Sequence, residues 1–290
     1  MSLIRKMLPE NLPESGEGIT NALKEALQSL ALLALWRGRF FEQAAFYGGT
    51  SLRILYGLDR FSEDLDFSLL QHSNDFSLKN YESFLRNEFN AFGLNLTFSV
   101  KQRSSEQAIE SAFLKTNTYE CMLNIETPPD IIRLVHPGSL LKIKLEIDTN
   151  PPPGFNTEMK YVFRPVQYAI RSFTLPSMFA GKIHALLCRQ WKTRVKGRDW
   201  YDFAWFVSMG STVNLEHLEA RMRQTGHYNS ESTLTADMLK DMIIDAVDKL
   251  DLDQAGKEVA PFLDNPSGID IWSKDFFIEA ARQIMAEQQK

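Results

Sequence analysis

Hydrophobic and polar residues alternate with two different periodicities along this chain, and the periodicity changes near residue 175. Before that point, short apolar runs with a repeat of two alternate with helical patterns, which predicts strands interspersed with helices. We expect helices over 18–40, 50–56 and 76–92, and extended segments over 44–47, 64–70, 94–101, 119–125 and 139–148.

From residue 175 onwards, apolar residues recur every three or four positions, which is typical of helices packed on one another. The helices predicted there span 176–189, 198–209, 215–223, 232–250, 252–263 and 274–289. The sequence therefore predicts an α+β fold, with a mixed-sheet core and N-terminal helix in residues 1–174 and a helical domain in residues 175–290.

Two carboxylates stand out in the strand predicted over 64–70. Asp64 and Asp66 are two residues apart, while the apolar residues between and after them face the other way. Alternate side chains of a strand project from one face, so both carboxylates would reach one divalent cation such as Mg²⁺. The alternative is an ordinary solvated strand face.

A second feature lies between the strand predicted over 44–47 and the helix after it. Gly48 and Gly49 would let the backbone approach a phosphate, and the helix N-terminus offers unpaired N–H groups. Thr50 and Ser51 add hydroxyl donors. Such a glycine pair can also be a plain tight turn, but a phosphate cradle followed by a carboxylate pair indicates nucleotidyl transfer.

The strand predicted over 139–148 carries two further carboxylates, Glu146 and Asp148, on its polar face. Either could be a third metal ligand, and an amphipathic strand with a solvated face is the alternative. Prolines 151–153 cannot donate ladder hydrogen bonds and must end this strand.

A separate group of charged residues occupies the first two helices after residue 175. Lys182 lies among small and apolar neighbours, and Asp199 and Asp202 share a helical face. If these helices close over a cleft, Lys182 would contact a nucleoside triphosphate, with Asp199 or Asp202 holding the lysine by an ion pair. Otherwise Lys182 reaches solvent and Asp199 is an ordinary charge at a helix start.

Composition narrows the class of protein. With 44% hydrophobic residues the 290-residue chain has enough apolar material for packed cores, and its net charge of −5 excludes a uniformly basic surface. One local run of basic residues could still bind a polyanion, and the alternative is a solvated helix end. The run consists of Lys182, Arg189, Lys192, Arg194, Lys196 and Arg198. Cys121 and Cys188 are expected to be buried free thiols, and the absence of a signal peptide or an apolar stretch of membrane-spanning length predicts a cytoplasmic protein.

Four motifs together resemble the AbiEii/AbiGii-toxin nucleotidyltransferase family, within the DNA polymerase β-like superfamily. They are Gly48-Gly49-Thr50-Ser51-Leu52-Arg53, the run from Arg60 to Phe67, Lys182 with the Ala-Leu-Leu after His184, and Arg198-Asp199-x-x-Asp202. The resemblance covers residues 40–207 and implies a two-metal core that uses Mg²⁺ and an NTP. It also implies the toxin of a toxin–antitoxin, or abortive-infection, pair with a separately encoded antitoxin.

The resemblance also implies roles for individual residues. Asp64 and Asp66 would bind Mg²⁺, with Asp148 or Glu146 as the third ligand, and Lys182 and Asp199 would match the downstream catalytic motifs. Arg60, Glu63 and Asp202 would support the site. The residues expected to bind the nucleotide are Gly48, Gly49, Thr50, Ser51, Arg53, Lys182 and Arg198.

The function expected from this reading is transfer of a nucleoside monophosphate from an NTP to an acceptor hydroxyl, with release of pyrophosphate. The acceptor would be an RNA 3′ end, above all that of tRNA, or a protein side chain. Two alternatives stay open: a nucleotide- or RNA-binding module without turnover, and a nucleotidyltransferase acting on a small molecule such as an aminoglycoside.

Overall fold

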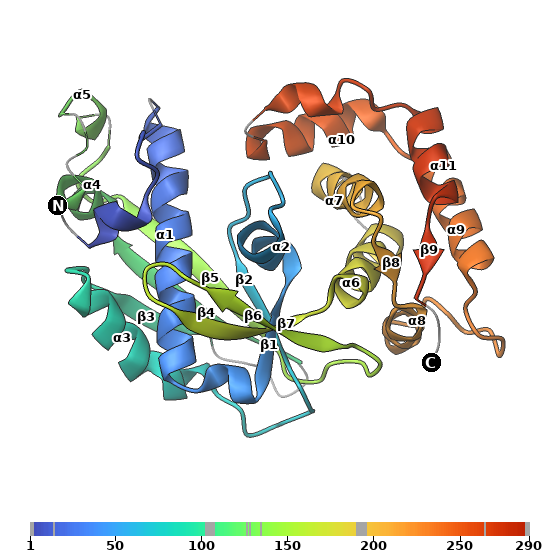
Figure 1. The fold of residues 1–290 in the computed structure, drawn as a ribbon, viewed down its shortest axis with the longest axis horizontal. Helices are drawn as coiled ribbons and strands as arrows, with labels where there is room; N and C mark the ends of the chain where they lie inside the picture. The colour runs from blue at the N-terminus through green and yellow to red at the C-terminus, as the bar shows by residue number, and fades with distance from the viewer. Residues whose placement is uncertain are drawn as a thin grey trace. The chain divides into compact units, whose positions relative to one another are not determined.

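The computed structural model describes residues 3–13, 15–101, 108–125, 127, 129–133, 135–189, 196–263 and 265–287 (Figure 1). The chain forms two compact units. We call residues 1–55, 63–151 and 159–172 the sheet unit, and residues 56–62, 152–158 and 173–290 the helical unit. The predicted α+β fold with a mixed sheet and helices is confirmed.

Within the described residues, the sheet unit is built on seven strands in the order β3-β4-β5-β2-β1-β7-β6. Neighbouring pairs β2–β5 and β1–β7 are parallel, whereas β1–β2, β3–β4 and β4–β5 are antiparallel. The strands are β1 Ala44–Tyr47, β2 Leu65–Leu69, β3 Thr97–Val100, β4 Ile109–Asn117, β5 Leu140–Asp148, β6 Thr157–Val162 and β7 Tyr168–Phe173.

Alternation along the central strands decides which face of the sheet is buried. Leu65 and Phe67 of β2 pair with Leu145 and Ile147 of β5, and all four are fully buried on the face that also packs against helix α1 (Gly16–Arg37). The opposite face carries the polar positions of both strands. Helix α1 begins where Ser15 accepts a hydrogen bond from the Gly18 N–H at 3.0 Å.

Shorter helices complete the sheet unit. They are α2 Gly48–Tyr56, α3 Glu82–Ala91, α4 Thr118–Asn124 and α5 Pro129–Ile132, with 3₁₀ turns η1 Ile4–Met7, η2 Phe40–Glu42 and η3 Leu78–Tyr81. The helix predicted over 76–92 thus begins with the 3₁₀ turn η3. In the described part of the chain, no helix combines the length and apolar character needed to cross a membrane.

In the sheet unit, one predicted strand is wrong and three strands were not predicted. Segment 119–125 is helix α4, because the Asn117 side chain accepts a hydrogen bond from the Glu120 N–H at 2.9 Å and starts a helix there. The partner of β5 on that side is instead β4, pairing from Ile109 to Asn117. Strands β4, β6 and β7 lie in segments for which no element was predicted.

The helical unit contains the helices predicted after residue 175. Its described elements are α6 Leu175–Cys188, α7 Gly197–Ser208, α8 Leu215–Gln224, α9 Ala236–Asp248, α10 Leu252–Val259, α11 Lys274–Arg282, 3₁₀ turns η4 Ala260–Phe262 and η5 Pro266–Ile269, and short strands β8 Thr212–Val213 and β9 Met285–Ala286. The last predicted helix stops at Arg282 because residues 285–286 pair with β8.

Aromatic residues form much of this unit's interior. Phe179 of α6 stacks on Phe206 of α7 with ring centroids 4.5 Å apart, and Trp200 meets Phe277 edge to face at 5.0 Å.

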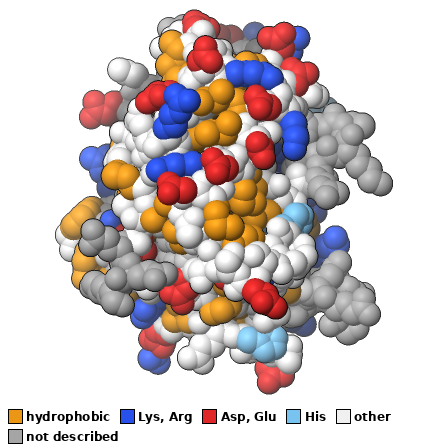
Figure 2. Space-filling model, turned by 90° about the vertical axis from the view of Figure 1, so that its right-hand side faces the viewer, with side chains coloured by type: hydrophobic (Ala, Val, Ile, Leu, Met, Phe, Trp, Pro, Cys, Tyr) orange, Lys and Arg blue, Asp and Glu red, His pale blue; other side chains and the backbone are white. Residues whose placement is uncertain are grey.

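Figure 2 shows acidic and basic side chains interspersed with apolar ones over the face in view. Among the described residues of that face, neither sign of charge predominates, whereas a nucleic-acid groove needs positive charge.

Candidate active site

Gly48 joins β1 to α2 and brings the start of this helix against Asp66. Its φ of +82° lies in the left-handed region, which favours glycine. A Cβ at position 48 would lie 3.0 Å from the Asp66 Cβ and 3.1 Å from its carboxyl carbon. Both the backbone conformation and the space therefore require glycine, and the result is a helix N-terminus that abuts a half-buried carboxylate.

Strand register places a second carboxylate beside the first. Asp66 pairs with Tyr47 of β1 on one side and with Glu146 of β5 on the other, whereas Asp148 pairs with Ser68, one step farther along the face. Cross-strand neighbours on one face are the residues whose side chains meet. Of the two candidates left open by the sequence, the register favours Glu146 as the partner of Asp66.

Each of these two β5 carboxylates has its own contacts. Glu146 forms an ion pair with Lys144 at 2.6 Å and accepts a hydrogen bond from the Ser111 hydroxyl at 3.3 Å. Asp148 accepts a hydrogen bond from the Asn150 N–H at 2.9 Å and so shapes the turn after the strand. Lys144 was not identified from the sequence, although its position two residues before Glu146 on the same strand face is a readable signal.

The donor set on this face suits a hard cation. Asp64, Asp66 and Glu146 offer the oxygen ligands that Mg²⁺ prefers, and Asp66 sits at a helix start where phosphate would also bind. Within the described ranges, no three His, Cys, Asp or Glu side chains are gathered closely enough to hold a metal by themselves. The carboxylates thus match Mg²⁺ in chemistry, and their joint binding of the ion stays a prediction.

The hydroxyls of Thr50 and Ser51 stabilise the start of helix α2, the predicted phosphate-binding segment. Both residues are fully buried: the Thr50 hydroxyl donates to the Asp64 carbonyl, and the Ser51 oxygen lies 3.1 Å from that of Ser172 on β7. Arg53, one turn farther along α2, forms an ion pair with Glu25 of α1. The structure therefore uses these three side chains to fix α2 and the Asp64 backbone, and their expected contact with the nucleotide stays a prediction.

Glu63 anchors the segment that enters β2. Its carboxylate forms an ion pair with Lys24 of α1 at 2.9 Å, and its carbonyl accepts a hydrogen bond from the Gln28 side chain at 2.9 Å. Two contacts to one helix hold the residue immediately before Asp64. The supporting role of Glu63 in the site stays a prediction.

In the helical unit, Asp202 is the centre of a buried charge cluster. It is fully buried on α7, accepts hydrogen bonds from Arg60 Nε at 2.6 Å and Nη2 at 2.7 Å, and forms an ion pair with Lys182 of α6 at 2.7 Å. Burial alone would raise the pKa of Asp202, but the two cations hold that pKa below its usual value. Asp202 therefore stays ionised and orients both basic side chains.

Asp199 does not hold Lys182. Its side chain is buried, and its oxygen Oδ2 has no hydrogen-bond partner among the residues that the structure describes. The neighbouring Arg198 pairs with Glu258 of α10 at 3.4 Å and lies 4.2 Å over the Phe262 ring. The catalytic role of Asp199 and the nucleotide-binding role of Arg198 stay predictions.

The basic run between residues 182 and 198 is only partly accounted for. Lys182 forms an ion pair with Asp202, and Arg198 forms one with Glu258. Lys192 and Arg194 lie outside the described residues. Its role as a polyanion site stays a prediction.

The chain was compared with protein families, with proteins that have curated descriptions and with solved structures. The sequence profile of the family described as "Nucleotidyl transferase AbiEii toxin, Type IV TA system" matches residues 30–280. Among proteins with curated descriptions, none matches this chain.

Two solved structures from Helicobacter pylori are similar to this chain. JHP933 superposes with a TM-score of 0.51 at 20% identity, covering 94% of this chain and 91% of its own. A protein provisionally described as a nucleotidyltransferase superposes with a TM-score of 0.48 at 19% identity, covering 90% of this chain and 91% of its own. At these identities the likeness to JHP933 concerns the fold alone.

Proposed function

This chain belongs to the AbiEii nucleotidyltransferase toxin family, and from that premise we propose that it transfers a nucleoside monophosphate from an NTP to an acceptor hydroxyl. The acceptor is the 3′ end of an RNA, foremost tRNA, with a protein side chain as the alternative. The observation that carries the proposal is the packing of the α2 N-terminus at Gly48 against Asp66, which has Glu146 beside it on β5. This packing supports a phosphate-binding site and a metal-binding site next to each other.

The chain's own residues bind and orient the reactants. The backbone N–H groups at the start of α2, next to the Asp66 carboxylate, would bind an anionic triphosphate, whose charge the helix dipole favours. Asp64, Asp66 and Glu146 would hold Mg²⁺. When bound, Mg²⁺ neutralises phosphate charge and lowers the pKa of the attacking hydroxyl. The acceptor oxygen then bonds to the α-phosphorus while the α–β anhydride bond breaks, releasing pyrophosphate.

Three interactions keep this arrangement fixed. The Thr50 hydroxyl ties α2 to the Asp64 carbonyl, and Lys144 with Ser111 orients Glu146. Positioning of this kind matters because phosphoryl chemistry depends on placement and electrostatics more than on covalent participation by the protein. The type IV description of the family further supports a separately encoded antitoxin as partner.

A label-transfer experiment tests the proposal. Purified protein is incubated with each α-³²P-labelled NTP, Mg²⁺ and total RNA, beside the variants Asp66→Asn and Asp148→Asn. We expect label in a tRNA-sized band, lost with Asp66→Asn and retained with Asp148→Asn, which removes a charge from the same face two residues away from Glu146. Label that survives in Asp66→Asn would contradict the assigned site. Label on protein would identify a protein acceptor, and label on a small molecule would make the chain a small-molecule nucleotidyltransferase.

A further inference from the structure

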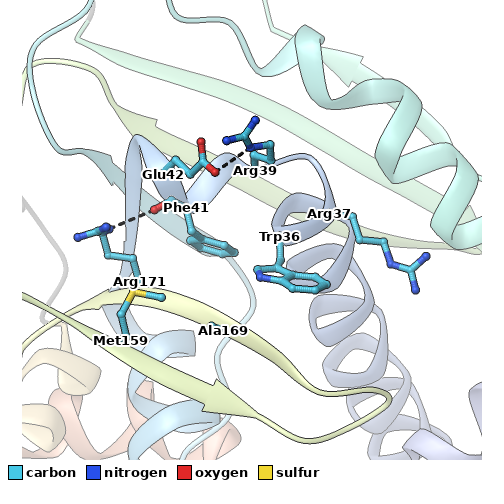
Figure 3. A pocket seen from close by; sticks show the side chains of 8 residues that line it. All are labelled: Trp36, Arg37, Arg39, Phe41, Glu42, Met159, Ala169 and Arg171. Atoms are coloured by element: carbon cyan, nitrogen blue, oxygen red, sulfur yellow. Dashed lines mark hydrogen bonds and ion pairs between the residues drawn. The ribbon is translucent and has the colours of Figure 1, made fainter.

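The sheet unit contains a cavity of about 530 Å³ at the end of β1 that is opposite to Gly48. Phe41 and Glu42, which line the cavity, precede β1, and Gly48 follows it, so the whole strand separates the two places. The other walls come from the last turn of α1, from β6 and from β7 (Figure 3). This cavity is therefore distinct from the carboxylate site.

Its centre is aromatic. Figure 3 shows the rings of Trp36 and Phe41 lying next to each other, with the Met159 side chain near Arg171. Trp36 keeps 39% of its surface exposed, and Met159 keeps 45%. An exposed indole face beside an open cavity is a surface on which a planar ring can stack.

Its margin is basic, although the chain as a whole carries a net charge of −5. Arg37, Arg39 and Arg171 line the cavity together with a single acidic residue, Glu42. Arg37 also forms an ion pair with Glu88 at 3.2 Å, and Arg39 forms one with Glu42, so the three guanidinium groups exceed these two carboxylates by one positive charge. That excess favours an anionic ligand.

Arg171 and Arg39 can still bind an anionic ligand. Arg171 donates from Nε to the Phe41 carbonyl at 3.1 Å, which fixes its position, and within the described part of the chain it has no carboxylate partner. Arg39 pairs with Glu42 at 2.7 Å, but both side chains are more than 60% exposed, so water screens this pair strongly. A phosphate bound at either guanidinium group would therefore break no buried ion pair.

The aromatic surface continues beyond the cavity along the edge strand β6. Tyr161 is two residues from Met159, hence on the same face of the strand, and it is 70% exposed. Phe163, just past the strand end, is 69% exposed. A row of exposed rings next to a basic cavity matches a chain of bases joined by phosphates better than it matches one free nucleotide.

We propose that this cavity binds one unpaired nucleotide of a single-stranded RNA, with its base on Trp36 and its phosphate at Arg171 and Arg39. The next base along the strand stacks on Tyr161. That this RNA is the acceptor rests on the proposed function, whereas the binding itself does not.

Fluorescence anisotropy of a labelled 12-nucleotide RNA, measured with the full chain and without NTP or Mg²⁺, tests the proposal. Trp36→Ala and Arg171→Gln should each weaken binding about tenfold, because loss of one base stack or one phosphate contact has an effect of this size. Trp36→Phe keeps a stacking ring and should retain most of the affinity. Arg133→Gln, which removes one exposed positive charge just after α5, is the matched control and should change affinity less than twofold.

Three results would overturn the proposal. The first is equal RNA affinity of Trp36→Ala, Arg171→Gln and wild type. The second is an equal loss of affinity in Arg133→Gln, which would show that net charge alone explains the effect. The third is displacement of the RNA by an acidic 12-residue peptide or by AMP at the concentration at which unlabelled RNA displaces it. The anisotropy assay contains neither NTP nor Mg²⁺, so it measures RNA binding alone. Failure of nucleotidyl transfer is thereby separated from failure of this site.

Discussion

At the scale of single residues, the sequence provided candidate residues for the site but not the contacts that they make. Asp64 and Asp66 could be identified because they are neighbours in the chain. The Arg60–Asp202 pair joins residues far apart in sequence, and its bidentate geometry depends on how α7 packs, which periodicity does not encode. Thr50 was expected to face the nucleotide, but its hydroxyl is bonded to the Asp64 carbonyl.

Substitution of Gly48 tests the close approach of α2 to Asp66. Gly48→Ala should lose about 1–2 kcal/mol of stability from the positive φ, and more from the contact with Asp66, and should lose most nucleotidyl transfer. Gly93→Ala is the control: its φ is +75°, and a Cβ there would meet nothing within 4 Å. Urea unfolding and label transfer measure both effects. Full activity of Gly48→Ala would show that the close approach is unnecessary.

The two aspartates of α7 should respond differently to neutralisation. Asp202→Asn leaves the buried Arg60 and the partly buried Lys182 without their counter-charge, so it should reduce the free energy of unfolding by about 3–5 kcal/mol. Asp199→Asn should change stability by about 1 kcal/mol or less, because Oδ2 has no hydrogen-bond partner in the described residues. Urea midpoints of the two variants compare them directly. Equal losses would refute the central position of Asp202.

At the scale of elements, the strands nearest the site were the most predictable. The ends of β1, β2 and β5 agree with prediction to within one residue, because clear alternation and flanking glycines or prolines define them. Segment 119–125 also alternates, but a local Asn117 cap outcompetes the strand pattern there. Which strands pair, and in which register, depends on tertiary packing and was not predictable from the sequence.

That register leads to a prediction about the third carboxylate. Glu146→Gln should lower kcat by about 10²-fold or more, whereas Asp148→Asn should change it by less than about threefold, because Glu146 and not Asp148 neighbours Asp66. Steady-state transfer kinetics with both variants decide between them. The reverse order of effects would assign the third carboxylate to Asp148.

A second element-scale prediction concerns α8 and the segment 152–158. His217 of α8 is buried against Phe155 and Phe173, and its Nδ1 lies 2.9 Å from the Pro153 carbonyl. Burial, reinforced by Arg221 and opposed by that carbonyl, lowers the pKa of His217 to about 4. The folded state thus binds fewer protons than the unfolded state, whose histidine titrates near 6.5.

The contribution of His217 to stability is therefore complete above pH 6.5 and is lost as pH falls towards 4. Between pH 7 and 4.5 we expect a loss of about 2–3 kcal/mol from this residue. His217→Phe keeps the aromatic packing and should flatten the pH dependence of the urea midpoint by that amount. His184→Gln is the companion variant, since the pKa of His184 is also lowered to about 4, chiefly by burial. An unchanged slope in His217→Phe would contradict the account.

At the scale of the whole molecule, family membership, the cradle at Gly48 and the carboxylate face agree on one reaction class. The net charge of −5 is compatible with RNA as acceptor because recognition would use local basic groups rather than the overall field. The central claim is that the bond between the α- and β-phosphates of the NTP is the one that breaks.

Parallel reactions with α-³²P- and γ-³²P-labelled NTP, resolved on a denaturing gel and by thin-layer chromatography, test that claim most directly. Nucleotidyl transfer predicts that the α-label enters the acceptor while the γ-label leaves as pyrophosphate, and that Asp66→Asn abolishes both. A γ-label on the acceptor would instead show transfer of the terminal phosphoryl group. That result, or an α-label that never leaves the free nucleotide pool, would contradict the account.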